Sequence, residues 1–266
     1  MLSEINNLID VKPGDKMNGC FVGITQSMSM NDGSFVIHHF LSHCLKSSTP
    51  VCFVALDQSF GHYNSVSQKF GTNLITQKEA NKLVFIEGLK IIGNLCLTDC
   101  DKGDNSGNLN DTKAVIYNLL QSIRTYYKEL KTKNNCAPTV IIDNVSVLIT
   151  LGFPLKDVIG FCHYLSELTQ DIKSSDTEGC LILYCNGERQ DGDEQLRTLW
   201  NWISHNCSLT IEVLGLASGY CKDVHGEILV RHNKPLRKPV TQRRMQYKLT
   251  DKSITMFAAG MSSAVL

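Results

Sequence analysis

Residues 20–45 read CFVGITQSMSMNDGSFVIHHFLSHCL and contain an apolar run, a polar loop and a second apolar segment. The run Cys20–Thr25 does not alternate with polar residues, which is typical of a strand covered on both faces. The second segment has helical spacing, with a stripe made of Phe35, Val36, Phe40, Cys44 and Leu45. Because covered parallel strands need helical crossovers, this stretch predicts the first unit of a parallel α/β sheet.

The same succession of apolar runs and helical stripes continues along the chain. Four further runs predict strands at Val51–Leu56, Leu83–Ile86, Thr139–Asp143 and Cys180–Cys185. Three further stripes predict helices: Val115, Leu119, Ile123, Tyr126 and Leu130, with Asp111 or Thr112 as N-cap; Val158, Cys162, Leu165, Thr169 and Ile172; and Leu196, Leu199, Trp200 and Ile203. The chain therefore reads as a domain with a mainly parallel sheet.

After about Cys207 the apolar residues alternate more cleanly with polar ones. The alternating runs are Ser208–Leu214, Glu227–His232, Met245–Leu249 and Ser253–Phe257, with a tight turn expected at 250–252. They predict antiparallel strands that extend one edge of the sheet. We expect one α/β domain over residues 1–266, with a flexible loop at 98–111 and a C-terminal tail at 259–266.

The composition is that of an ordinary globular protein, with 266 residues, 42% of them hydrophobic, and 26 Lys+Arg against 26 Asp+Glu. This balance excludes a uniformly basic coat for nucleic acid but not a local basic patch. The eleven cysteines are an odd number and several lie in apolar runs, so we expect reduced core thiols. The first ten residues lack the features of a signal peptide, and the longest apolar stretch, Val145–Leu155, is too short to cross a membrane. We therefore expect an intracellular protein.

The loop after the first strand is where a doubly wound sheet binds phosphate, at the start of the following helix. A working phosphate loop places a lysine before its Ser or Thr, but here no lysine lies between Lys16 and Lys46. Gly33 and Ser34 remain as a vestige of a nucleotide site, and the neighbouring Asp32 would repel a triphosphate. We expect weak anion binding at most and no self-sufficient ATPase.

Asp143 ends an apolar strand, as the magnesium-binding aspartate of a nucleotide site does. Many buried strands also end in aspartate for structural reasons. The alternative to a vestigial nucleotide role is that Asp143 caps the turn into Asn144 and Val145. The sequence leaves both possibilities open.

Seven basic residues and no acidic residue lie between Ile228 and Thr250, so the rest of the chain is net acidic. Such segregation favours a surface that binds phosphate or an acidic partner, but a solvated loop around Pro235 and Pro239 would have the same composition. The residues that we take as candidates for RNA contact in this segment are Arg231, Arg237, Lys238, Arg243 and Arg244. Arg189 is a further candidate, in the loop 187–194.

An ordered series of segments resembles one known family. They are DGSFVIHHFL at 32–41, VCFVAL at 51–56, QSFGHY at 58–63, LVFIEGLK at 83–90, DNVSVLITLG at 143–152, GLASGYCKDVHGEI at 215–228 and QYKLTDKSITMFAAGMSSAVL at 246–266. These segments are similar to the Elongator complex protein 6 family, the sixth subunits of the Elongator tRNA-modifying assembly. The match is poor over residues 98–136.

This resemblance implies a RecA-like three-layer fold without a usable phosphate-loop lysine. It implies assembly with Elongator subunits four and five into a hetero-hexameric ring that binds tRNA and docks on the catalytic Elongator subcomplex. The carboxymethyl-type modification at carbon five of the wobble uridine would belong to the catalytic subunit. We therefore expect no catalytic residue, cofactor or metal in this chain, and a cytoplasmic protein with the nucleus as a second compartment.

Two other functions compete with this one. The first is an autonomous P-loop ATPase or kinase with an atypical loop. The second is a RecA-like accessory protein of DNA recombination, which would prefer single-stranded DNA to tRNA. Absence of nucleotide hydrolysis by the chain alone would exclude the first, and a preference for tRNA over single-stranded DNA in competition would exclude the second.

Overall fold

The computed structural model describes residues 2–26, 33–100, 112–170, 178–187, 193–216, 221–233, 241–250 and 253–258. Across these residues a nine-stranded sheet forms the centre, in the order β3-β2-β4-β5-β1-β6-β7-β8-β9. The strands are β1 (Phe21–Gln26), β2 (Val51–Ala55), β3 (Leu83–Glu87), β4 (Thr139–Ile142), β5 (Cys180–Asn186), β6 (Leu209–Leu214), β7 (Gly226–His232), β8 (Thr241–Leu249) and β9 (Ile254–Phe257).

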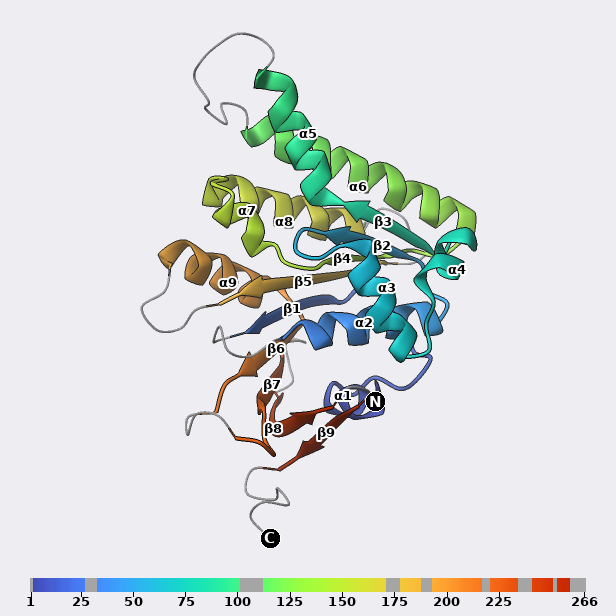
Figure 1. Ribbon diagram of the computed structural model, residues 1–266, viewed down its shortest axis with the longest axis vertical. Helices are drawn as coiled ribbons and strands as arrows, with labels where there is room; N and C mark the ends of the chain where they lie inside the picture. The colour runs from blue at the N-terminus through green and yellow to red at the C-terminus, as the bar shows by residue number, and fades with distance from the viewer. Residues whose placement is uncertain are drawn as a thin grey trace.

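The helices cover both faces of this sheet and give three layers (Figure 1). They are α1 (Leu2–Leu8), α2 (Ser34–Lys46), α3 (Phe60–Lys69), α4 (Leu74–Glu79), α5 (Gly88–Cys100), α6 (Thr112–Asn134), α7 (Ser146–Thr150), α8 (Leu155–Thr169) and α9 (Glu194–Asn206). One core cluster joins the sheet to α1–α4 and the other joins it to α5–α9. On β4, Ile141 belongs to the first cluster, whereas Val140 and Ile142 belong to the second. Both sheet faces are therefore buried, as the apolar strand sequences predicted.

Strand pairing confirms a mainly parallel sheet with antiparallel strands at its C-terminal end. β3, β2, β4, β5, β1 and β6 are parallel, and β7, β8 and β9 continue the sheet in antiparallel fashion. The antiparallel prediction for Ser208–Leu214 was wrong on one side, because β6 pairs in parallel with β1. The crossover through α9 returns the chain in the parallel direction, so only the pairing with β7 is antiparallel.

The predicted helices correspond to α2, α6, α8 and α9, with one error in the stripe of α6, and Ile172 of the α8 stripe lies outside the described residues. In α6, Tyr127 is buried and Tyr126 is exposed, because Tyr127 continues the row of Leu119 and Ile123 at intervals of four residues. Five helices were not predicted, namely α1, α3, α4, α5 and α7. Helix α3 shows why, since it buries only Tyr63 and Ser67 and has no continuous apolar stripe.

Only some of the other predictions from the sequence concern residues that the structure describes. Residues 98–100 end α5, while the rest of the expected loop 98–111 and the tail 259–266 lie outside the described residues. At the turn after β8, the backbone N–H of Thr250 donates to the Ser253 carbonyl at 2.8 Å.

The nine cysteines with described side chains are free thiols, and burial raises the pKa of Cys52 to about 12. No helix in the described part of the chain has the length and apolar character needed to cross a membrane.

Candidate functional site

The candidate nucleotide site lies at the carboxyl edge of β1, β4 and β5, where the strand arrows of Figure 1 end. Residues 27–32, the middle of the loop from β1 to α2, lie outside the described residues. Gly33 is the N-cap of α2, and its backbone N–H donates to Oε1 of Gln26 at 2.8 Å. Ser34 follows as the first residue of the helix. The N–H of Gly33 is therefore used inside the chain and is not directed at a ligand.

Asp143, at the end of β4, is buried and accepts hydrogen bonds from four donors. Its Oδ1 accepts from the Leu56 backbone N–H at 2.6 Å, and its Oδ2 accepts from the Tyr63 hydroxyl at 3.0 Å. The backbone N–H groups of Asp57 and Gln58 also donate to Oδ2, at 3.1 and 3.4 Å. A carboxylate offers about two acceptor positions on each oxygen, so the three donors to Oδ2 saturate that oxygen, while Oδ1 accepts one bond.

Burial raises the pKa of Asp143 to about 6, and the four hydrogen bonds act in the opposite direction. The carboxylate thus ties the loop after β2 to the end of β4, which is a structural role. The alternative prediction, that Asp143 caps the turn into Asn144 and Val145, was wrong. That turn is capped by Asn144, whose Oδ1 accepts from the Ser146 backbone N–H at 3.2 Å.

The ends of β4, β5 and β1 are also joined directly to one another. The Ser146 hydroxyl accepts from the Asn186 backbone N–H at 2.8 Å, and the Gly187 backbone N–H donates to the Gln26 carbonyl at 3.0 Å. Gly187 has no room for a side chain, because a Cβ there would lie 2.5 Å from the Thr25 hydroxyl oxygen. Among the described residues, no group of three or more His, Cys, Asp or Glu side chains is placed to hold a metal ion.

Gly23 lies in β1 and serves packing. A Cβ on Gly23 would lie 2.7 Å from Cγ2 of Ile203, so glycine allows α9 to approach the centre of the sheet closely. Close packing of α9 therefore explains this glycine.

The described cations of the basic segment 228–250 lie beside acidic residues in the folded chain, although the segment itself contains none. Each of its four described cations pairs with a carboxylate from outside the segment: Arg231 with Glu212, Arg243 with Asp10, Arg244 with Glu227 and Lys248 with Asp223. Arg237 and Lys238 lie outside the described residues, as does Arg189. Each described cation of the segment therefore lies beside a carboxylate of the same chain.

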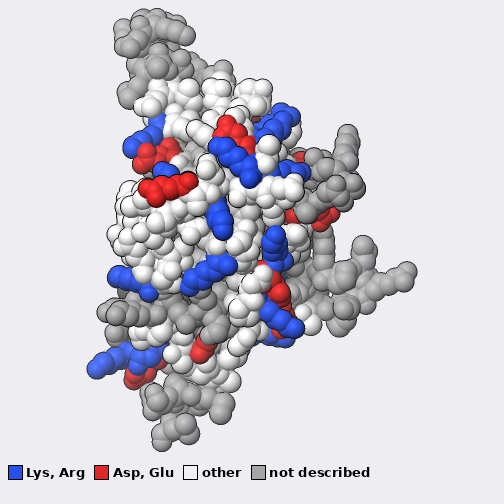
Figure 2. Space-filling view, turned by 90° about the vertical axis from the view of Figure 1, so that its right-hand side faces the viewer, with Lys and Arg blue, Asp and Glu red and all other residues white. Residues whose placement is uncertain are grey.

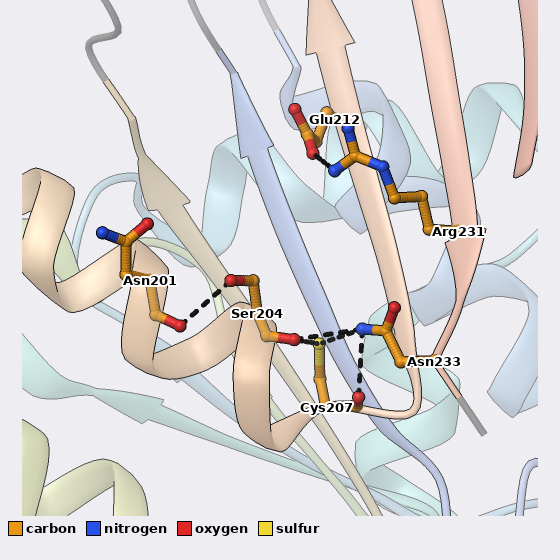
Figure 3. A network of polar contacts seen from close by, with 6 residues as sticks. All are labelled: Asn201, Ser204, Cys207, Glu212, Arg231 and Asn233. Carbon is orange, nitrogen blue, oxygen red and sulfur yellow. Dashed lines mark hydrogen bonds and ion pairs between the residues drawn. The ribbon is translucent and has the colours of Figure 1, made fainter. Parts of the chain in front are cut away.

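Figure 3 shows the most buried of these pairs and its surroundings. Glu212 on β6 is 1% exposed and pairs with Arg231 on β7. Nearby, the Asn233 side-chain amide donates to the carbonyls of Ser204 and Cys207, at 3.0 and 3.2 Å, which ties the end of β7 to α9. Arg231 is therefore held by a buried carboxylate and does not point freely at a partner.

The sequence did not reveal these carboxylate partners, and the fold explains why. Asp10 lies 233 residues before Arg243, and the two meet only because α1 packs beside the last strands. Charge segregation along the chain is therefore not charge segregation on the surface.

Comparison with known proteins supports both the fold and the family. The model of the family described as Elongation complex protein 6 matches residues 2–251. Proteins named Elongator complex protein 6 are 34% identical over 275 residues in Rattus norvegicus and 34% over 280 residues in Homo sapiens, with both chains fully covered in each case. The Drosophila melanogaster protein of that name is 24% identical over 250 residues, which cover 90% of each chain.

A solved structure shares the fold. The KaiC-like protein from Pyrococcus horikoshii has a TM-score of 0.58 and 12% identity, and the alignment covers 93% of this chain and 98% of that chain. At this identity the likeness concerns the fold alone, and it confirms the RecA-like fold that the family resemblance implied. The family match over nearly the whole length carries more, and with the full-length relatives it shows that the chain belongs to the Elongation complex protein 6 family.

Proposed function

We propose that this chain is a non-catalytic RecA-like subunit of the accessory ring of Elongator. In this proposal it assembles with Elongator subunits four and five into a hetero-hexamer that binds tRNA and docks on the catalytic subcomplex. The ring supports the 5-carboxymethyl-type modification of the wobble uridine, in the cytoplasm and, as a second compartment, in the nucleus. The observation that carries the proposal is the family match over residues 2–251.

The chemistry of the former nucleotide site supports a non-catalytic role. No lysine lies between Lys16 and Lys46, although the phosphate loop of a working nucleotidase needs one. The N–H of Gly33 is bonded to Gln26, and the carboxylate of Asp143 is bonded to four donors of the chain. These contacts favour a retained scaffold over an autonomous ATPase or kinase.

The proposal is tested by deleting the gene and measuring 5-carboxymethyl-type wobble uridines in bulk tRNA by mass spectrometry. We expect the modified nucleosides to disappear and to return with the wild-type chain. A Ser34→Ala chain should restore them equally well, because the remaining loop hydroxyl has no catalytic task. Normal modification without the chain would overturn the proposal, and failure of Ser34→Ala alone would favour an active nucleotide site.

A further inference from the structure

Every large aromatic side chain that the described part of the protein exposes lies on α6 or on the neighbouring helix α8. Tyr117 and Tyr126 lie on α6 and are 59% and 40% exposed, and Tyr164 on α8 is 61% exposed. The other exposed large apolar residues in the described ranges are aliphatic. Exposed tyrosine rings offer flat faces for stacking and a polar tip for hydrogen bonds. Their concentration beside one helix marks a candidate binding surface.

Two of these tyrosines line a groove of about 630 Å³ between α6 and α8. Tyr117 and Tyr164 share it with two cations of α6, Arg124 and Lys128, and with one carboxylate, Glu167. Two partly buried leucines supply its aliphatic part. The groove therefore combines aromatic faces with a net positive charge.

The third tyrosine lines a smaller groove of about 230 Å³ on the other side of α6, beside α4 and β3. Tyr126 there lies with Lys78, Lys133 and one carboxylate, Glu129. Lys78 lies over the Phe60 ring at 4.7 Å, and Lys133 is 4.0 Å from Glu129 on the exposed surface. Such exposed pairs are weak and leave a lysine able to bind another anion. The same combination of tyrosine and two cations thus occurs on both flanks of α6.

The dipole of α6 does not explain all of the cations on this helix. Lysine in the last turn of a helix stabilises the carboxyl-terminal dipole, which accounts for Lys131 and Lys133. Arg124 and Lys128 precede that turn, and among the described residues neither has a carboxylate within ion-pair distance. Figure 2 views the molecule from the end where α4 and the last turn of α6 lie, and it shows Lys and Arg side chains spread over that end, with acidic ones beside some of them.

We propose that the surface of α6, with its two grooves, binds RNA. Unpaired bases stack on Tyr117 and Tyr164, while Arg124 and Lys128 pair with the phosphates. This inference rests on the proposed function, because it names the surface through which the subunit meets tRNA. It also places the contact on a surface other than the described part of the segment 228–250, where Arg231 is held by the buried Glu212.

RNA fits this surface better than a protein partner does. The buried core of a protein interface is depleted of lysine and glutamate, whereas each groove here is lined by both residue types. Each groove also carries two cations against one carboxylate. Aromatic faces along a basic track are what single-stranded nucleotides require.

The test measures binding of a fluorescently labelled, unmodified tRNA transcript to the full-length chain assembled with Elongator subunits four and five. Tyr117→Ala with Tyr164→Ala should weaken binding at least tenfold, because stacking is lost. The corresponding double change to Phe keeps both rings and should restore most of the affinity. Arg124→Gln with Lys128→Gln should lower the slope of log affinity against log salt by about 1.4, for two lost phosphate contacts.

The matched control replaces Lys113 on α6 and Lys156 on α8 by Gln. These lysines are exposed on the same two helices but line neither groove, so the charge change is equal and the salt slope should stay near that of the wild type. Urea unfolding of each variant verifies that the fold is intact. Photo-crosslinking with 4-thiouridine transcripts should place adducts on peptides from 112–134 and 155–169.

The outcomes separate this inference from the proposed function. An assembled wild type that binds no tRNA refutes the proposed function and the inference with it. A wild type that binds, with groove variants that bind equally well, refutes the inference alone and places the RNA elsewhere. Groove variants that no longer co-purify with the partner subunits would show a protein interface and would also overturn it.

Discussion

Replacing Asp143 by Asn tests whether this carboxylate is a buried structural group. Burial raises the pKa of Asp143 from 3.8 to about 6, so the folded protein binds a proton here more readily than the unfolded chain does. The resulting stabilisation is complete below pH 3.8 and is lost as the pH rises through 6. Asn does not titrate, so the difference between wild type and Asp143→Asn should follow this one group.

The magnitude follows from the two pKa values. Between pH 7.5 and pH 5.0 the wild type should gain about 1.4 kcal/mol in its free energy of unfolding relative to Asp143→Asn. Other titrating groups, such as His39, are present in both proteins and cancel in the difference.

The assay is urea unfolding of both proteins at pH 7.5, 6.5 and 5.0, followed by circular dichroism. Asp57→Asn is the matched control for the loss of one carboxylate, because the Asp57 side chain is exposed in the loop that Asp143 holds. A flat difference for Asp143→Asn would refute a raised pKa. A difference of opposite sign would show a carboxylate kept charged, as a cation site requires.

Three further predictions concern packing and buried charge. Burial lowers the pKa of His39 to about 3, so the folded protein should lose about 2 kcal/mol of stability between pH 7.5 and pH 5.0 through this residue. His39→Leu should remove that loss in urea titrations and the exposed His163→Leu should not. Gly23→Ala should cost about 1–3 kcal/mol in thermal unfolding through the clash with Ile203, whereas Gly160→Ala, in open space on α8, should be neutral or stabilising. Arg231→Met should cost about 3 kcal/mol because it removes a cation from the buried Glu212 carboxylate, against less than about 1 kcal/mol for Arg243→Met, whose pair with Asp10 is exposed; equal losses would contradict this ranking.

The sequence predicted those parts of the fold that depend on local pattern. The strands at 51–56, 139–143 and 180–185 are covered on both faces, so their apolar runs are continuous and their parallel arrangement could be inferred. Helix α2 was equally plain, since its stripe is long and apolar.

What the sequence did not predict depends on contacts between distant segments. The parallel pairing of β6 with β1 is set by the crossover through α9, and the run 208–214 by itself carries no direction. Likewise, the adjacent residues Tyr126 and Tyr127 differ only in which one continues the buried row of α6.

The candidate site shows the same limit more strongly. The missing lysine was visible in the sequence, but the role of Asp143 became clear only from Leu56 and Tyr63, which lie more than 70 residues earlier in the chain. The charge of the segment 228–250 was likewise misleading, because its partners Asp10 and Glu212 come from other elements.

The central claim is that this chain acts as a subunit of a ring, and native mass spectrometry tests it most directly. The chain is co-expressed with Elongator subunits four and five, purified through a tag on subunit four, and measured with and without an unmodified tRNA transcript. We predict a hetero-hexamer that contains this chain and gains the mass of the transcript when tRNA is added. Purified subunit four that lacks this chain, with the chain left in the unbound fraction at its own mass of 29.6 kDa, would contradict the account.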